Sequence, residues 1–294
     1  LPVASMIRST PSGLSLSKTN KQIGVFSSNV TPIIVYDDSL NIKFSSSIAS
    51  NNIRIQNKPY RGNISFKVDS SNKLTVINSL PIEDYLYGVV AKEMPASWNK
   101  EALKAQAISA RNYAVKNLNK YKKLGFDLCT TQNSQVYGGV DAENFNTNKA
   151  VDETRGILAY YNGEVAELYY HSSSGGKTEN SENIWSNAVP YLKAVDDPYS
   201  LGSPNDYWEY KISKSELEKL LNNKDKNIGN LIGIRIDNVS SNGRVLKLTI
   251  IGDKSEVSLE KESIRGFLGY SNLKSNWFEV NGKNKYNQTR SNNS

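Results

Sequence analysis

The sequence has very little of the side chains that build disulfide frameworks and metal centres. Its 294 residues include one cysteine, Cys129, and one histidine, His171. A single cysteine cannot form an internal disulfide, and the pair supplies only two of the roughly four strong ligands that a structural zinc site takes. We therefore expect no cofactor and no resident metal, with Cys129 and His171 as weak candidates for zinc.

Long hydrophobic runs are also missing. No stretch approaches the roughly 20 apolar residues of a membrane-spanning helix. The polar residues 1–22 predict a flexible stalk, of the kind that follows an anchor or export signal absent from this chain. The expected location is therefore outside the cytoplasm and attached to a membrane. Residues 284–294 are expected to be a frayed tail.

The charge is unbalanced toward the positive side, with a formal net charge of +7. A basic protein favours an anionic partner, such as a nucleic acid, an acidic polymer or a wall glycan bearing carboxylates. The two-Cys, two-His finger spacing and the aromatic strand signature of common RNA-binding modules are both missing from the sequence. We therefore expect no nucleic-acid partner.

Hydrophobic periodicity predicts strands first and helices afterwards. Residues 23–80 hold β-branched and aromatic clusters separated by turn residues, which is typical of short antiparallel strands. A second β-rich flank is expected over 205–283, and Asn-Gly dipeptides at 162–163 and 242–243 predict hairpin turns. Helices are expected at about 81–93, 100–121, 144–154, 213–222 and 259–267. The pattern predicts an α+β fold in which antiparallel strands and hairpins surround a helical centre.

One acidic residue stands at a predicted helix end. The stretch Gly88–Pro95 reads GVVAKEMP, and Pro95 stops the helix so that Glu93 lies at a bend. In the following helix Lys104 and Arg111 are seven residues apart, about two turns, and are expected on one face. This pattern fits a binding groove, and it equally fits a salt-linked structural bend with a solvated helix face.

A second candidate follows the first hairpin, where His171 leads into three serines and two glycines. Ser173, Ser174 and Gly175 form the middle of this loop. Hydroxyl groups suit a polyhydroxy ligand, and glycine allows a ligand to approach the backbone closely. A plain turn has the same composition, so both interpretations stay open.

Five stretches in this order resemble one protein family. They are LPIEDYLYGVVAKEMP, ALKAQAISARNYA, CTTQNSQVYGG, YYHSSSGGKTENSENIW and PYLKAVDDP. In order and spacing they resemble the stage II sporulation protein D family, SpoIID/LytB, with core motifs over residues 75–200 and a looser likeness further on. The resemblance implies one SpoIID-like catalytic region over 23–283. It also implies that the predicted helical centre is the catalytic centre.

The family's sporulation members are lytic transglycosylases that cut peptide-stripped glycan strands of peptidoglycan during engulfment, and other members enhance amidases. The resemblance therefore implies a polysaccharide lyase in which Glu93 is the acid and base, Lys104 and Arg111 lie in the groove, and Gln135 and Tyr137 belong to the binding loop. Peptidoglycan glycan, an amidase and membrane-anchored wall-remodelling proteins are the implied partners. Peptide-stripped muramic acid carries a free lactyl carboxylate, which would give the two cations a ligand.

The residues favour a mechanism with one carboxyl group. An ordinary glycosidase needs two carboxyl groups about 5–9.5 Å apart. Glu83 lies ten residues before Glu93, a rise of about 15 Å along a helix, and is badly placed as a partner. A noncatalytic glycan-binding amidase enhancer remains the alternative. A thiol protease built from Cys129, His171 and Asn183 is disfavoured, because the local cysteine signature is missing.

Overall fold

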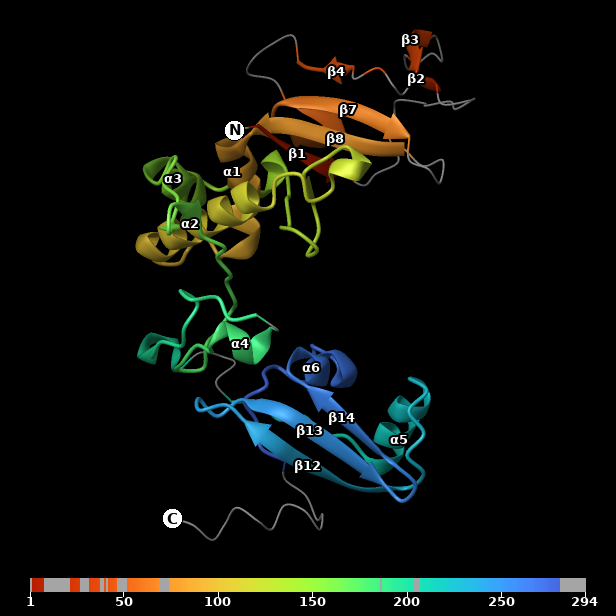
Figure 1. The fold of residues 1–294 in the computed structure, drawn as a ribbon. Coiled ribbons are helices and arrows are strands. Elements are labelled where there is room, and N and C mark those ends of the chain that lie inside the picture. The colour runs from red at the N-terminus through yellow and green to blue at the C-terminus, as the bar shows by residue number, and fades with distance from the viewer. Residues whose placement is uncertain are drawn as a thin grey trace. The chain divides into compact units, whose positions relative to one another are not determined.

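Buried hydrophobic residues form separate main clusters in the two halves of the chain. One cluster joins residues between Ile23 and Val151, and the other joins residues between Leu217 and Leu273. The chain accordingly divides into a first unit, Leu1–Tyr170, and a second unit, His171–Ser294 (Figure 1). The single region expected over 23–283 is thus split at residue 170.

The computed structural model describes residues 2–7, 22–26, 32–37, 40, 42–46, 52–68, 74–185, 187–202 and 207–280. The predicted frayed tail, 284–294, lies outside the described residues. Within the described ranges no helix combines the length and the apolar character needed to cross a membrane.

A five-stranded sheet with the order β4-β7-β8-β1-β9 forms the first unit's β layer. Its members are β1 (Pro2–Ile7), β4 (Lys43–Phe44), β7 (Asn63–Val68), β8 (Leu74–Pro81) and β9 (Leu128–Cys129). β1 pairs antiparallel with β8 along its whole length and parallel with β9. The predicted stalk is therefore wrong for Pro2–Ile7, whose backbone bonds strands on both sides. Residues 8–21 of the predicted stalk lie outside the described residues.

Two further antiparallel pairs belong to the first unit. β2 (Gln22–Phe26) pairs with β3 (Pro32–Asp37), and β5 (Ile53–Ile55) pairs with β6 (Lys58–Tyr60). Together with β4, β7 and β8, these pairs confirm the antiparallel strands predicted for residues 23–80. The α+β fold class is confirmed as well.

Capping residues and a proline set the ends of α-helices in the first unit. The helices are α1 (Ile82–Glu93), α2 (Lys100–Lys116), α3 (Phe145–Glu153) and the short 3₁₀ turns η1 (Lys122–Leu124) and η2 (Val140–Ala142). α1 ends because Met94, which precedes Pro95, is extended with φ −139° and ψ 134°. α2 begins at Asn99, whose side chain accepts a hydrogen bond from the Glu101 backbone N–H.

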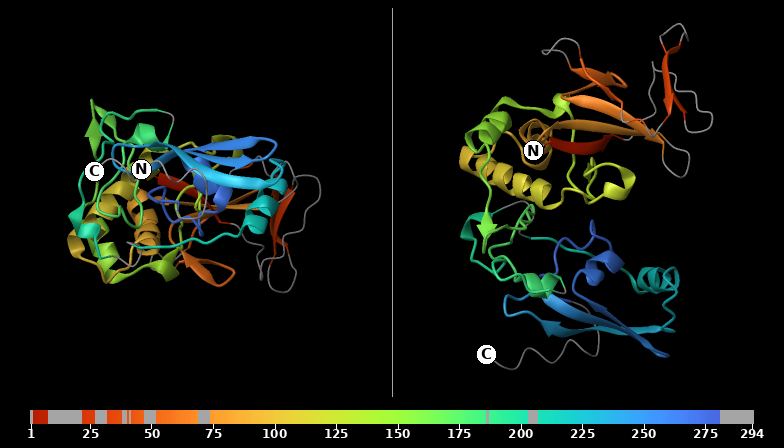
Figure 2. Two further views of the ribbon diagram at one scale, coloured as in Figure 1. Left: turned by 90° about the horizontal axis from the view of Figure 1, so that it is seen from below. Right: turned by 45° about the horizontal axis from the view of Figure 1, so that its top comes forward.

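Small residues let these helices pack closely. Ala107, Ala110 and Ala114 on α2 are fully buried, as are Tyr85 and Val89 on α1. The three α-helices contact one another beside the sheet (Figure 2). The buried alanines leave room for α1 and α3 to lie close against α2.

Hairpin turns fall where Asn-Gly dipeptides predict them. In the first unit, β10 (Tyr160–Tyr161) and β11 (Glu164–Val165) pair across Asn162 and Gly163, which have φ of 50° and 82°. Positive φ at both central residues is the conformation that an Asn-Gly hairpin turn adopts.

The second unit is a three-stranded antiparallel sheet with two helices on its core. The strands are β12 (Leu231–Val239), β13 (Val245–Gly252) and β14 (Glu256–Glu260), in that order, and the helices are α5 (Lys214–Asn222) and α6 (Glu262–Leu268). Leu217 of α5, Leu248 of β13 and Ile264 of α6 share one cluster. The short elements α4 (Ser181–Ile184) and η3 (Pro198–Ser200) precede this core.

Candidate functional site

Glu93 is the last residue of α1, at the bend that Pro95 enforces. Its carboxyl group is half-buried, and this burial raises its pKa above the ordinary value of a glutamate, although a hydrogen bond from the Val136 backbone acts in the opposite direction. Neither cause is a nearby cation. The expected salt-linked arrangement of Glu93 with Lys104 and Arg111 is therefore not what sets its ionisation.

The loop that carries Val136 is fastened to α1. The Gly138 N–H donates to the Gly88 carbonyl at 3.1 Å. A Cβ on Gly88 would lie only 2.5 Å from the Tyr137 ring, so glycine is what lets the ring rest on the helix. The GVVAKEMP stretch thus supplies both the carboxyl group and the surface that positions the loop beside it.

Tyr170 also belongs to this neighbourhood. Burial raises its pKa to about 12, with a further contribution from the negative charge of Glu93, while a hydrogen bond from Gln135 opposes the shift. Gln135 Nε2 donates to the Tyr170 hydroxyl at 3.3 Å, so the phenol oxygen accepts and its own proton remains available for donation. The sequence analysis did not place Tyr170 in the site; its position directly before His171 and the serine loop was the signal.

Gln135 and Tyr137 are buried, at 1% and 7% exposure. Gln135 also donates to the Ala110 carbonyl at 3.2 Å, and the Tyr137 hydroxyl donates to Asn78 Oδ1 at 3.1 Å. These bonds hold the loop against the rest of the unit, which positions the Val136 backbone and Tyr170. A direct contact of either side chain with a ligand stays a prediction.

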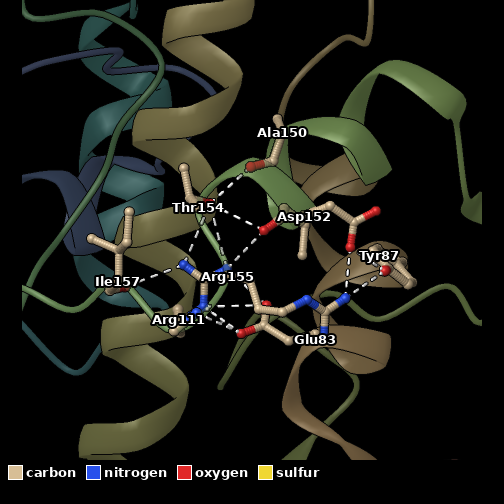
Figure 3. Close-up of polar contacts among 10 residues, drawn as sticks. Glu83, Tyr87, Arg111, Ala150, Asp152, Thr154, Arg155 and Ile157 are labelled. Carbon is tan, nitrogen blue, oxygen red and sulfur yellow. Dashed lines mark hydrogen bonds and ion pairs between the residues drawn. The ribbon is translucent and has the colours of Figure 1, made fainter.

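Arg111 is the clearest correction. Its side chain is 1% exposed and forms a bidentate ion pair with Glu83 of α1, with Nη2 to Oε2 at 2.7 Å and Nε to Oε1 at 3.0 Å. Its remaining donors face the Thr154 hydroxyl and the Val151 and Ile157 carbonyls (Figure 3). A guanidinium enclosed in this way links α1, α2 and the end of α3 through hydrogen bonds. It has no exposed donor with which to bind a lactyl carboxylate.

Lys104 differs from Arg111 although both lie on α2. Its side chain is partly exposed and pairs with Glu101 one turn earlier, at 3.0 Å. Such an exposed pair is weak and opens easily. A role for Lys104 in binding a ligand therefore stays a prediction.

The serine loop lies in the second unit. Ser173, Ser174 and Gly175 line a pocket of about 530 Å³ whose lining residues all belong to that unit. Ser174 is buried, and its hydroxyl bonds Asp197 and Ser200, both at 2.7 Å, so it shapes the loop. The predicted site residues are thus divided between the two units.

The comparisons with known proteins fit this division. Residues 70–161 match the model of the SpoIID family, described as stage II sporulation protein. This stretch is a SpoIID domain. It holds Glu93, Lys104, Arg111, Gln135 and Tyr137 and ends before Tyr170. Residues 202–293 match the model of a different family, described as a domain of unknown function (DUF8618). The looser SpoIID likeness expected for the C-terminal part stays a prediction.

Two curated relatives show what the chain is similar to. The chain is 40% identical over 191 residues to a protein of Bacillus subtilis (strain 168) called amidase enhancer, covering 65% of this chain and 26% of the relative. It is 32% identical over 184 residues to stage II sporulation protein D of the same organism, covering 58% of this chain and 50% of the relative. The chain therefore spans about a quarter to a half of these relatives.

The weak zinc candidates do not lie in one unit. Cys129 ends β9 in the first unit, whereas His171 opens the second. Burial raises the pKa of the Cys129 thiol, but hydrogen bonds between its sulfur and the hydroxyl groups of Ser134 and Thr131 outweigh burial and lower the value to about 7. In the described part of the chain, no three His, Cys, Asp or Glu residues are grouped to hold a metal ion.

Proposed function

We propose that the SpoIID domain is a lytic transglycosylase that cleaves peptide-stripped glycan strands of peptidoglycan. The observation that carries the proposal is the half-buried Glu93 carboxyl group with its raised pKa, held at a helix end by the Val136 backbone. A general acid must keep its proton near the working pH, and burial is the ordinary means by which proteins achieve this with glutamate. Glu93 supplies that acid.

The proposed reaction uses Glu93 twice. Its carboxyl group first gives a proton to the glycosidic oxygen as the bond from that oxygen to C1 of muramic acid breaks. The resulting carboxylate then takes the proton of the muramic acid C6 hydroxyl, whose oxygen bonds to C1 and closes a 1,6-anhydro ring. The proton returns to Glu93, and no water is consumed. In this proposal the Val136 N–H and the Tyr170 hydroxyl orient the reacting groups.

The positions of the other carboxyl groups on α1 support a mechanism with one acid. Glu83, one of the two candidates on α1 for a second carboxylate, is paired with Arg111 at 2.7 Å. Asp84 lies nine residues before Glu93, a rise of roughly 13 Å along the helix, beyond the separation that a paired glycosidase needs. Its charged neighbours are Arg61, Glu143, Arg155 and Asp152, and burial raises its pKa.

Product analysis tests the proposal. Peptide-free glycan strands incubated with the protein are expected to yield 1,6-anhydromuramic ends, detected by mass spectrometry. Glu93→Gln should lower their rate of formation by roughly 10²–10⁴-fold, the contribution typical of a general acid. The exposed Glu164 offers a matched control, because Glu164→Gln removes the same charge from β11. Unchanged cutting by Glu93→Gln, or no anhydro ends with the wild type, would contradict the proposal.

A second candidate function is favoured by the relative named amidase enhancer. In that case the chain would bind glycan without cutting it and stimulate a wall amidase outside the cytoplasm. Amidase turnover on intact peptidoglycan, measured with the wild type and with Glu93→Gln, separates the two. Equal stimulation by both proteins, together with an absence of anhydro ends, would favour the enhancer. A sporulation role and membrane attachment belong to either version of the proposal.

A further inference from the structure

The second unit has a pocket whose chemistry the proposed reaction does not use. The pocket holds about 530 Å³ and is lined by the serine loop together with residues that precede or follow the sheet of β12 to β14. The lining residues beyond Ser172–Gly175 are Trp208, Arg265, Tyr270, Lys274, Ser275 and Trp277. This is the size of a site for one or two small rings.

The serine loop is fixed before any ligand arrives. Arg244 of the β12–β13 turn donates to the carbonyls of Ser174 at 3.0 Å, Lys177 at 2.7 Å and Thr178 at 3.3 Å. Burial lowers the pKa of Arg244, and the nearby Glu179 carboxylate acts the other way. A guanidinium that bonds three backbone carbonyls within residues 174–178 holds this segment in one conformation, so the wall of the pocket is preformed.

The same arginine positions an aromatic wall. The Arg244 guanidinium lies over the Trp277 ring, 4.9 Å from its centroid. Gly243 makes room for this ring, because a Cβ there would lie 2.8 Å from Trp277 Nε1. Tyr270 is held similarly by Arg265, at 5.0 Å from its ring centroid. Trp277 and Tyr270 nevertheless remain 40% and 58% exposed, so ring surface is left for a ligand.

The charge of the lining is positive. Lys274 is exposed, and Arg265 already uses Nε on the Leu273 carbonyl and lies 3.6 Å from Glu262. Among the described lining residues there is no carboxylate. Aromatic faces pack against the C–H face of a sugar ring, serine hydroxyls and backbone groups bond its hydroxyls, and a lysine attracts an anion.

We propose that this pocket binds an anionic sugar unit, with Trp277 as the stacking face and Lys274 as the principal anion contact. The site lies wholly in the second unit and does not depend on Glu93. The anion can be a carboxylate, as in muramic acid, or a phosphate, since an ammonium group binds either. The second unit thus carries a glycan-recognition site of its own, beside the catalytic role proposed for the SpoIID domain.

The test is a titration of the full chain, followed through the indole N–H signals of its tryptophans by NMR. N-acetylmuramic acid and N-acetylglucosamine 6-phosphate are compared with neutral N-acetylglucosamine, which shares the ring of both. The Trp277 signal, identified with Trp277→Phe, should shift with the acidic sugars at roughly threefold to tenfold lower concentration than with the neutral sugar. Response to one acidic sugar alone identifies the anion. Equal affinity for all three sugars, or no shift, overturns the proposal.

Variants make the result specific. Lys274→Glu changes an exposed side chain and should abolish the preference for acidic sugars, whereas Lys226→Glu, an equal charge change on another exposed lysine of this unit, should leave it intact. Trp277→Ala should weaken binding of every sugar. An unchanged preference in Lys274→Glu overturns the assignment. Glu93→Gln should bind like the wild type, so failure of the cutting assay and failure of this proposal are distinguishable.

Discussion

The polar residues around α1 and α2 and those around the pocket of the second unit are used in opposite ways. In the first unit, Arg111, Gln135 and Tyr137 are buried and form hydrogen bonds with other residues of the protein. In the second, Lys274 and Trp277 keep much of their surface exposed around a hollow. The first arrangement stabilises a scaffold that presents one carboxyl group, and the second presents a recognition surface.

This difference teaches that residue type alone does not identify a binding residue. Arginine, glutamine and tyrosine suit a glycan site, yet the same donors also satisfy buried carboxylates and carbonyls. Exposure decides between the two uses. Substitutions at buried and at exposed polar residues can therefore test this difference.

The largest expected effect is on the buried ion pair. Arg111→Ala leaves the Glu83 carboxylate buried without its partner, which should lower the free energy of unfolding by about 3–5 kcal/mol. Urea denaturation followed by circular dichroism measures the loss. Replacing both residues, in Arg111→Met with Glu83→Leu, should recover most of it, because no charge is then left uncompensated. Lys104→Ala, the matched cation on α2, should cost at most about 1 kcal/mol. Similar losses for Arg111→Ala and Lys104→Ala would remove the distinction between the two cations.

A smaller effect is expected for one substitution made in both units. Gly88→Ala would force a methyl group to within 2.5 Å of the Tyr137 ring, and overpacking of this kind costs about 1–3 kcal/mol. On α6 the nearest atom to a Cβ at Gly266 is the Tyr270 hydroxyl oxygen at 3.5 Å, an ordinary contact. Gly266→Ala should therefore stabilise by up to about 1 kcal/mol through helix propensity. Thermal unfolding of both variants checks the opposite signs, and a stabilised Gly88→Ala would show that the loop does not need its close fit on α1.

The smallest effect concerns Glu93 and pH. Burial raises its pKa in the folded state, so between the unfolded value, about 4.3, and the raised value the folded protein binds more protons. Stability from this group therefore falls as the pH rises through that window and stays lower above it. Glu93→Gln should be more stable than the wild type at about pH 7, and the gain should shrink on acidification toward about pH 4. Denaturant titrations at the two pH values measure this, and a variant less stable at neutral pH would contradict the burial of a charged carboxylate.

Much of the fold follows from local sequence. Helices expected at 144–154 and 213–222 are found as Phe145–Glu153 and Lys214–Asn222, because Asn144 and Ser213 cap them as such residues do in general. The second helix was expected to reach residue 121 and ends at Lys116. β1 was missed, because a strand that completes a sheet between β8 and β9 is stabilised by partners distant in sequence rather than by its own pattern.

The candidate site was predictable only in part. Pro95 after Glu93 is a local signal, and the bend it predicts is present. The burial of Arg111 could not be predicted from the sequence. Its helical spacing from Lys104 predicts that the two residues share a face of the helix, but it does not show which segments cover that face. Glu83, Thr154 and the Ile157 carbonyl come from distant segments and enclose it. Trp277 and Lys274 lie about a hundred residues from the serine loop that they join, so no spacing argument connects them.

Sequence by itself determined the SpoIID motifs, the helix end at Glu93, the hairpin turns and the α+β character, because each depends on neighbours along the chain. The tertiary structure determines which polar groups are bonded within the protein and which stay exposed to a ligand. It enclosed Arg111 with Glu83, left the Glu93 carboxyl half-buried with a raised pKa, and brought Lys274 and Trp277 to the serine loop. Burial and pairing arise from contacts between distant segments, and those contacts exist only in the folded chain.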